Sequence, residues 1–363
     1  MYMFRAIFYS LLFMLLLGYS VFSDRVAYFI LSGLVQQTDH AYTSTTHHDL
    51  IELPSSLENE LAIPSILIEN TSYQQASVID GLLSIRQPAT PLGALVNIYC
   101  THKTGRQIRT TTGSGFFIHP RGVILTNAHV SQLLLLAQVD GDTECIARKG
   151  TPATSAYNID LLYISPAWIR QHAHLLRSTS PSGTGERDYA LLYVTGSLTD
   201  TPLPNQFPTL PIKTSPLPLS YKNTPIRAAG YPATALATEG RFADLRGVEV
   251  GSIITELMTF GSNMVDLVTL AGTELGTQGV SGGPVVNQEG RAIGLITTRG
   301  NDELFGNGSL RALTISYIDR TISEETGFSL TQNLGGDLNR RAKIFQETIG
   351  VFLTSILRNE LER

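Results

Sequence analysis

Short apolar runs separated by turn residues fill the middle of this chain. Between Leu92 and about Tyr317 the runs are rich in Val, Ile, Leu and aromatic residues, and HPRG, NQEG and GNDELFGNG are typical of the turns. The runs include ALVNIYC, GSGFFI, GVILTNA, LLLLAQV, YALLYV, GSIITEL, MVDLVTL and AIGLITT. No long helical period lies between them, so the pattern predicts about a dozen strands in an antiparallel sandwich or barrels.

A continuous apolar run begins near the N-terminus. It extends from Ala6 to Phe22 and follows the basic residue Arg5. Its length predicts a signal-anchor helix that stays in the membrane, with a signal peptide cleaved after Ser23 and a buried globular helix as alternatives. Either membrane interpretation exports the rest of the chain. We therefore expect a single-pass cell-membrane protein with its body on the periplasmic or extracellular side, or a secreted protein if the segment is cleaved.

Two further segments flank the β-rich part. Residues 36–90 contain the polar stretch QQTDHAYTSTTHHDL and prolines, which predict a linker or stalk with little structure, and His47-His48 within it is typical of a solvated tract. At the C-terminus, apolar residues recur at helical spacing at Leu338, Ala342, Phe345, Ile349, Phe352 and Ile356. This predicts an amphipathic helix that either docks on the sheets or mediates self-association. The predicted divisions are 1–35 (membrane or signal region), 36–90 (linker), 91–331 (β-rich domain) and 332–363 (C-terminal helix).

Composition narrows the class of partner. The 363 residues are 42% hydrophobic and only 16% charged, with a net charge of −5, which argues against nucleic acid. The two cysteines, Cys100 and Cys145, match neither a zinc pattern nor a CxxC motif. They are either two inert buried thiols or one disulfide, and export favours the disulfide. We expect no metal and no organic cofactor.

Three motifs carry candidate chemistry. Residues 276–286 read GTQGVSGGPVV, which is either an ordinary glycine-rich turn or a backbone cradle that presents Ser281. Upstream, TNAHV contains His129 at the end of an apolar run, and RDYALLYV contains Asp188 just before another. A serine hydroxyl needs a base to take its proton, and imidazole is suited to that task. A carboxylate then fixes the tautomer of the imidazole and stabilises the imidazolium.

The glycines around Ser281 fit this chemistry. Negative charge that develops on an attacked carbonyl oxygen needs preorganised hydrogen-bond donors. The backbone N–H groups of Gly279 and Ser281 are the candidates for this oxyanion hole. A side chain at position 279 would hinder the backbone conformation that turns its N–H inward.

These motifs resemble those of the trypsin-like serine proteases with the chymotrypsin fold. TNAHV, DYALL, GVSGGPVV and the lead-in GSGFFI are most similar to the bacterial HtrA-like branch, and the resemblance extends over about residues 92–320. It implies an all-β fold of two six-stranded antiparallel barrels, with the triad in the cleft between them. It also implies that Cys100 and Cys145 lie on the first and fourth strands of the first barrel, which are neighbours.

The chain departs from the family pattern in three places. Val280 stands where the family usually carries Asp or Asn, so it cannot pair with a new N-terminus. About 45 residues follow the protease-like part, too few for the PDZ domain that HtrA proteins carry. The stretch 150–187 predicts an enlarged loop before Asp188.

The resemblance also places residues that contact substrate. Thr297 falls where a hydroxyl often contacts the aspartate, although it is equally typical of a plain strand threonine. Thr297, Thr298 and Arg299 correspond to the edge strand that pairs with the substrate backbone. Leu275 and Gln278 correspond to one wall of the specificity pocket. Because no acidic residue lies there, we expect a small or medium apolar side chain at the cleavage site rather than Lys or Arg.

The sequence therefore predicts an exported, membrane-tethered serine endopeptidase that cleaves proteins or peptides through an acyl-enzyme. Its expected partners are its substrates, the membrane at the N-terminal helix and a second copy at the C-terminal helix. The alternatives are an inactive binding or scaffold protein of the same fold and, third, an esterase.

Overall fold

The computed structural model describes residues 50–53, 66–77, 88–104, 107–137, 139, 141–177, 183–233 and 244–362. The predicted membrane segment, Ala6–Phe22, and the pair His47-His48 lie outside these residues. Among the helices of the described part, none combines the length and apolarity needed to cross a membrane.

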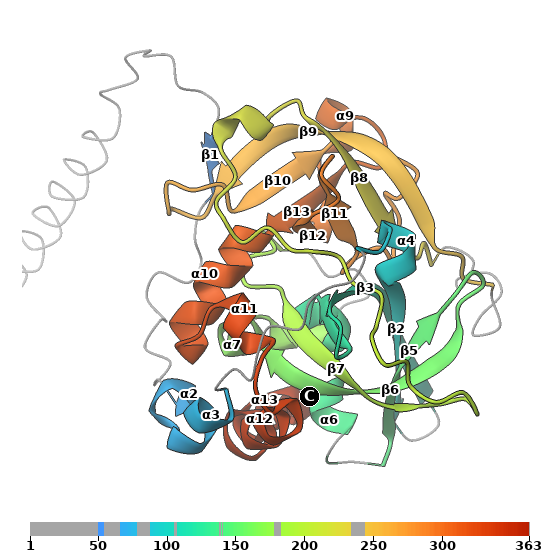
Figure 1. Cartoon of the computed structure of the whole chain (residues 1–363), viewed down its shortest axis with the longest axis vertical. Coiled ribbons are helices and arrows are strands. Elements are labelled where there is room, and N and C mark those ends of the chain that lie inside the picture. The colour runs from blue at the N-terminus through green and yellow to red at the C-terminus, as the bar shows by residue number, and fades with distance from the viewer. Residues whose placement is uncertain are drawn as a thin grey trace, which may run out of the picture. The chain divides into compact units, whose positions relative to one another are not determined.

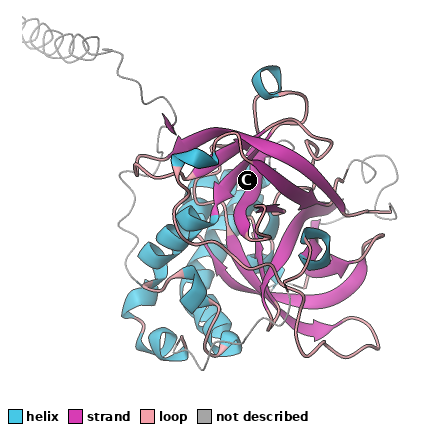
Figure 2. Cartoon of the chain, turned by 45° about the horizontal axis from the view of Figure 1, so that its top comes forward, coloured by secondary structure: helices cyan, strands magenta, loops and turns pink. Residues whose placement is uncertain are grey.

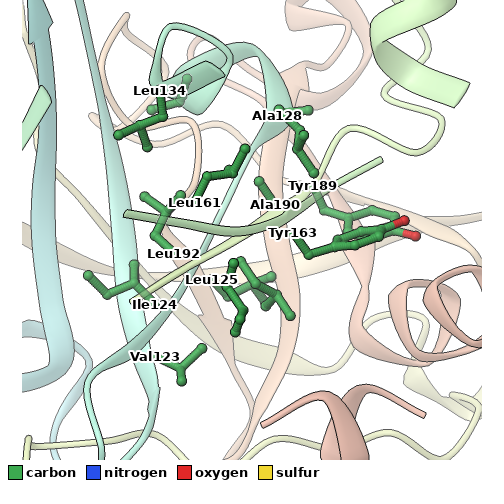
Figure 3. Packing of buried hydrophobic residues seen from close by; sticks show 14 of the residues in the cluster. Val123, Ile124, Leu125, Ala128, Leu134, Leu161, Tyr163, Tyr189, Ala190 and Leu192 are labelled. Carbon is green, nitrogen blue, oxygen red and sulfur yellow. The ribbon is translucent and has the colours of Figure 1, made fainter. Parts of the chain in front are cut away.

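Six antiparallel strands close into a first barrel, in the order β2-β3-β4-β7-β6-β5 (Figure 1). They are β2 (Leu95–Thr104), β3 (Gln107–His119), β4 (Val123–Thr126), β5 (Thr143–Lys149), β6 (Thr154–Ile164) and β7 (Ala190–Ser197). The apolar run GVILT becomes β4, which is buried along its whole length between β3 and β7. Figure 3 shows how Leu125, Leu161 and Leu192 from three of these strands meet in the core. The interior is thus filled by side chains, as small barrels require.

A second barrel follows in the chain. Its strands are β8 (Pro225–Gly230), β9 (Val248–Thr259), β10 (Leu267–Leu270), β11 (Pro284–Val286), β12 (Ala292–Arg299) and β13 (Leu310–Thr314). Their order is β9-β10-β13-β12-β11-β8, and the pairing of β8 with β9 closes the barrel. Two six-stranded antiparallel barrels confirm this part of the predicted fold, whereas the predicted membrane helix lies outside the described residues.

Strands β2 and β5 carry the two cysteines. Cys100 and Cys145 lie directly opposite each other in this antiparallel pair, with their Cα atoms 4.1 Å apart, and they form a disulfide. Of the two alternatives for these cysteines, the disulfide is therefore correct. It joins the first and fourth strands of the first barrel, as the family resemblance implied.

Most of the helices gather beside the first barrel, whereas α9 lies beside the second (Figures 1 and 2). The longer ones follow the last strand and are α10 (Ile315–Thr326), α12 (Leu338–Phe345) and α13 (Val351–Leu361), with the short α11 (Leu330–Asn333) between the first two. The others are short: α2 (Ile66–Glu69), α3 (Thr71–Ala76), α4 (Pro91–Ala94), α5 (Ala128–Ser131), α6 (Leu134–Ala137), α7 (Pro166–His172), α9 (Asp302–Phe305) and the 3₁₀ turns Ala173–Arg177 and Leu219–Tyr221.

The C-terminal helix packs on the first barrel. Its apolar stripe is buried from Leu338 to Ile349 as predicted, but Phe352 is 53% exposed, and Leu353 and Leu357 are buried instead. The π-helical turn Gln346–Gly350 between α12 and α13 explains this difference. A π turn inserts one residue into the helical register, which moves the buried position from 352 to 353. The buried stripe belongs to the same core cluster as the first barrel.

The expectation of a linker with little structure does not hold for the described residues between 50 and 77. Strand β1 (Leu50–Glu52) pairs in parallel with the end of β9, and α2 and α3 bury Leu67 and Tyr73. Tyr73 lies against the fully buried Arg341 of α12, whose guanidinium is 5.2 Å from the ring centroid. These apolar residues are stabilised by distant parts of the chain, which local periodicity does not reveal.

Candidate active site

His129 and Asp188 are joined by two hydrogen bonds. His129 lies in the short helix α5, directly after β4, and Asp188 lies just before β7, the strand that pairs with β4. The backbone N–H of His129 donates to Asp188 Oδ1 at 3.0 Å, and its ring Nδ1 lies 2.7 Å from Oδ2. The pairing of the two strands brings together residues that are 59 apart in sequence. The carboxylate thereby fixes both the position and the tautomer of the imidazole.

Asp188 is buried and fully partnered. Thr297 Oγ1 donates to its Oδ2 at 2.8 Å, and Asn127 Nδ2 donates to its backbone carbonyl at 2.8 Å. Burial by itself raises the pKa of the Asp188 carboxyl, but its interactions with His129 and Thr297 outweigh burial and hold that pKa below the usual value. The side chain is therefore a carboxylate at neutral pH.

Ser281 lies in the turn before β11, beside the same threonine. Its hydroxyl donates a 3.4 Å hydrogen bond to the backbone carbonyl of Thr297. Thr297 therefore contacts Asp188 through its side chain and Ser281 through its backbone. Among the described residues no hydrogen bond joins Ser281 to His129. In serine hydrolases without substrate such bonds are often long and tighten only in the complex.

The glycines around Ser281 are explained by close contacts. Gly279 has a φ of +94°, and a Cβ there would lie 2.5 Å from the carbonyl oxygen of Tyr231. Gly282 has a φ of +89°, and a Cβ there would lie 1.9 Å from the carbonyl oxygen of Ser114. Both positions combine a left-handed backbone with no room for a side chain. Of the two interpretations of GTQGVSGGPVV, the cradle fits these contacts.

The peptide group between Gln278 and Gly279 has a defined direction. The carbonyl of Gln278 accepts a 2.7 Å hydrogen bond from the N–H of Ala233. A trans peptide places its N–H on the side opposite its carbonyl, so the Gly279 N–H points away from Ala233. Within the described part of the chain, neither this N–H nor that of Ser281 has an acceptor. Both donors are therefore available to a bound group.

Comparison with known proteins agrees with this geometry. The family model of the trypsin-like peptidase domain matches residues 113–295, about half of the chain, which include His129, Asp188 and Ser281. The chain belongs to the trypsin-like peptidase family. A search of curated proteins found no match. Membership of a peptidase family implies protein or peptide substrates.

One departure from the usual peptidase pattern has a clear structural role. Val280 is 1% exposed and belongs to the core cluster of the second barrel. It packs on β8, where a Cβ added to Gly230 would lie 2.9 Å from the Cβ of Val280. In this chain the loop before Ser281 is therefore fixed by apolar packing at the position where a carboxylate would require a charged partner.

The predicted substrate-contacting residues fall into two groups. Thr298 and Arg299 pair with β13 at Arg311 and Leu310, whereas the pairing of β12 with β11 ends at Leu295. Within the described strands the other edge of this segment is therefore unpaired, as strand addition by a peptide requires.

The other group lies on the segment just before Ser281. Leu275 is fully buried in the core of the second barrel, and Gln278 is exposed. Arg299 on the edge strand forms an ion pair with Asp302 at 3.0 Å. Neither of the two predicted pocket residues, Leu275 and Gln278, carries a carboxylate.

Sequence reasoning missed Ser114, which joins the first barrel to the loop of Ser281. Its Oγ donates to the carbonyl of Gly279 at 2.8 Å and accepts from the N–H of Tyr231 at 2.8 Å. Its backbone N–H donates to the carbonyl of Ser281 at 2.7 Å. The sequence feature that could have revealed Ser114 is its position between two glycines in GSGFF. Glycines on both sides allow the backbone of this strand to approach the Ser281 loop closely.

Sequence reasoning also missed Asn127 and Arg187, the neighbours of the candidate histidine and aspartate. The rings of His172 and His174 stack with their centroids 6.4 Å apart, and His172 also stacks on Trp168. Across the described residues no three His, Cys, Asp or Glu side chains are placed to hold a metal ion.

Proposed function

We propose that this protein is a serine endopeptidase in which Ser281 is the nucleophile, His129 the general base and Asp188 the group that orients the base. The observation that carries the proposal is the double hydrogen bond between His129 and Asp188, to which Thr297 adds a third. A buried, ionised carboxylate beside an imidazole orients the ring and stabilises an imidazolium.

The proposed reaction forms an acyl-enzyme. Ser281 Oγ attacks the carbonyl carbon of the scissile peptide while its proton moves to His129 Nε2. The resulting oxyanion accepts hydrogen bonds from the N–H groups of Gly279 and Ser281. The C–N bond then breaks, and the amine leaves with the proton from His129. Water attacks the ester by the same steps and regenerates Ser281.

Substrate is proposed to bind as an added strand along Thr297–Arg299. Hydrogen bonds from this edge hold the peptide backbone, which favours peptides over simple esters. Leu275 gives the segment before Ser281 an apolar anchor, and neither of the described pocket residues Leu275 and Gln278 carries a carboxylate to select Lys or Arg. A small or medium apolar residue before the scissile bond is the specificity that these residues favour.

We also propose that the protein is exported and membrane-tethered and that it belongs to the HtrA-like branch of the family. The disulfide Cys100–Cys145 supports an oxidising compartment, and the apolar run Ala6–Phe22 supports export and a membrane tether. The motifs GSGFFI and TNAHV support the HtrA-like branch.

Labelling with a fluorophosphonate tests the proposal. The full chain is compared with Ser281→Ala and His129→Ala, and far-UV circular dichroism confirms that each is folded. We expect the wild type to be labelled at one site and neither variant to be labelled. A folded wild-type protein that is not labelled, at any pH between 6 and 9, would contradict the peptidase and favour a binding protein of the same fold.

A further inference from the structure

Residues on both sides of Asp188 are bonded to helix α10. Before it, Arg187 donates to Glu325 Oε1 at 2.8 Å and to Glu324 Oε2 at 2.8 Å. After it, the hydroxyl of Tyr189 lies 2.8 Å from Thr321 Oγ1. The loop that carries the aspartate is therefore attached to one helix at two points.

The backbone at Arg187 requires such an attachment. Arg187 has a φ of +55°, a left-handed conformation that costs a non-glycine residue about 1–2 kcal/mol. Among the described residues its N–H has no backbone acceptor, and it donates instead to the hydroxyl of Tyr317 at 3.2 Å. The side chain is only 5% exposed. A buried arginine in this conformation is stable only while its ion pair is intact.

Glu325 is the centre of this attachment. It is 7% exposed, and besides Arg187 it accepts hydrogen bonds from Ser165 Oγ at 3.1 Å and from the hydroxyl of Tyr163. Figure 3 shows the rings of Tyr163 and Tyr189 side by side with their hydroxyl groups pointing the same way, and both hydroxyls bind α10. Helix α10 is thus fixed to β6, to the start of β7 and to Arg187, all in the first barrel.

The same helix is fixed to the second barrel. It begins directly after β13, and its Arg320 donates to Oδ1 of the fully buried Asp266 at 2.7 Å. The nucleophile Ser281 belongs to the second barrel, whereas His129 and Asp188 belong to the first. Helix α10 therefore connects the barrel of the nucleophile with the loop of the aspartate.

We propose that Arg187 and Glu325 are positioning residues for catalysis: their buried ion pair ties the Asp188 loop to α10 and so sets the place of the carboxylate against His129. Neither residue touches the reacting atoms. A loop held in this way keeps the two His129–Asp188 hydrogen bonds aligned, and a displacement of about 1 Å in such a geometry costs roughly 100-fold in rate.

The test uses Arg187→Lys in the full chain, which keeps the charge and removes the planar fork that reaches two carboxylates. The matched control is Arg341→Lys. Arg341 is also fully buried and lies in the same group of helices, but its guanidinium binds the Asn333 carbonyl and Tyr73 and does not contact the Asp188 loop. Both substitutions lower the melting temperature.

Two readouts separate positioning from simple destabilisation. The first is fluorophosphonate labelling, in which Arg187→Lys is expected to lower the maximal rate about 10- to 100-fold with the half-saturating concentration changed less than about twofold. The second is the deshielded 1H NMR signal of the proton between His129 and Asp188, assigned by its loss in His129→Gln. It is expected to disappear in Arg187→Lys and to persist in Arg341→Lys, which also labels at the wild-type rate.

Glu325→Gln serves as a second variant if Arg187→Lys does not fold, because glutamine keeps the shape but removes the charge and replaces one of the two acceptor oxygens with a donor. A wild-type rate and an intact 1H signal in the folded variant would overturn the proposal, as would equal losses in the Arg341→Lys control. This inference rests on the catalytic function proposed above. The NMR signal does not require activity, so it distinguishes a failure of the positioning proposal from a failure of the peptidase proposal. A wild type that is not labelled but loses its signal in Arg187→Lys refutes the peptidase and supports the positioning.

Discussion

Thr297 donates a 2.8 Å hydrogen bond to the same oxygen of Asp188 that lies 2.7 Å from the imidazole of His129. The two donors come from different barrels, and they hold the carboxylate between them.

Replacing Thr297 by Val keeps the shape of the side chain and removes its hydroxyl donor. The buried Oδ2 of Asp188 then loses one of its hydrogen bonds. A hydrogen bond to a charged group is worth about 1.5–3 kcal/mol, so we expect the labelling rate to fall about tenfold or more. Thr297→Ser, which keeps the hydroxyl, is the control and should stay within about threefold of the wild type.

Gly279 and Gly290 provide a matched pair for testing the cradle. Both have a positive φ, +94° and +74°, but a Cβ at Gly279 would lie 2.5 Å from the Tyr231 carbonyl, whereas nothing lies within 4 Å at Gly290. Gly279→Ala should displace the N–H that faces the oxyanion and lower the labelling rate about 100- to 1,000-fold. Gly290→Ala should cost about 1–2 kcal/mol of stability and leave the rate unchanged. Equal rates in the two variants would exclude Gly279 from the oxyanion hole.

The disulfide Cys100–Cys145 closes a loop with a sequence separation of 45 in the first barrel. Because a crosslink of this length restricts the unfolded chain, replacing both cysteines by alanine should lower the free energy of unfolding by about 2–4 kcal/mol. Urea unfolding with and without a reductant measures this. The reductant should destabilise the wild type alone, and a wild type that unfolds at the same urea concentration in both conditions would show that the bond adds no stability.

His119 gives the protein a defined sensitivity to mild acid. Burial, together with the charge of Arg121, lowers the pKa of His119 from 6.5 to about 4, and its Nδ1 accepts a hydrogen bond from the Arg121 N–H. The folded pKa lies below the unfolded one, so the unfolded chain binds the proton first as the pH falls. The stability contribution is complete above pH 6.5 and is lost progressively between pH 6.5 and about 4.

We therefore expect the wild type to lose about 1–2 kcal/mol more than His119→Gln over that pH range, after allowance for partial exposure of the ring. Urea unfolding at pH 7, 6, 5 and 4 provides the comparison. Parallel curves for the two proteins over this range would show that His119 titrates in the folded state as it does in the unfolded chain.

The strand pattern and the three short motifs were readable from the sequence for physical reasons. Alternating and continuous apolar runs report burial directly, and the glycines of GTQGVSGGPVV report places where the backbone has no room for a side chain. The order of His129, Asp188 and Ser281 also indicated the chemistry, because few residue combinations activate a serine.

The register of the C-terminal helix and the structure within residues 50–77 were not readable in this way. The π turn at Gln346–Gly350 shifts the buried face by one residue, which a regular helical period does not predict. Tyr73 is buried through Arg341, a residue 268 positions away. Such contacts depend on which segments meet in space and leave little local trace.

The sequence by itself determined the strands, the glycine cradle and the identity of the candidate triad, because these follow from local burial, local backbone freedom and the chemistry of each side chain. Only the tertiary structure decided what holds the triad in place. Ser114 and Thr297 act across the two barrels, and the Arg187–Glu325 pair joins the first barrel to α10; the partners in these contacts are 109 to 165 residues apart. Hydrogen bonds and buried ion pairs require distances within a few tenths of an ångström, which folding of the whole chain sets.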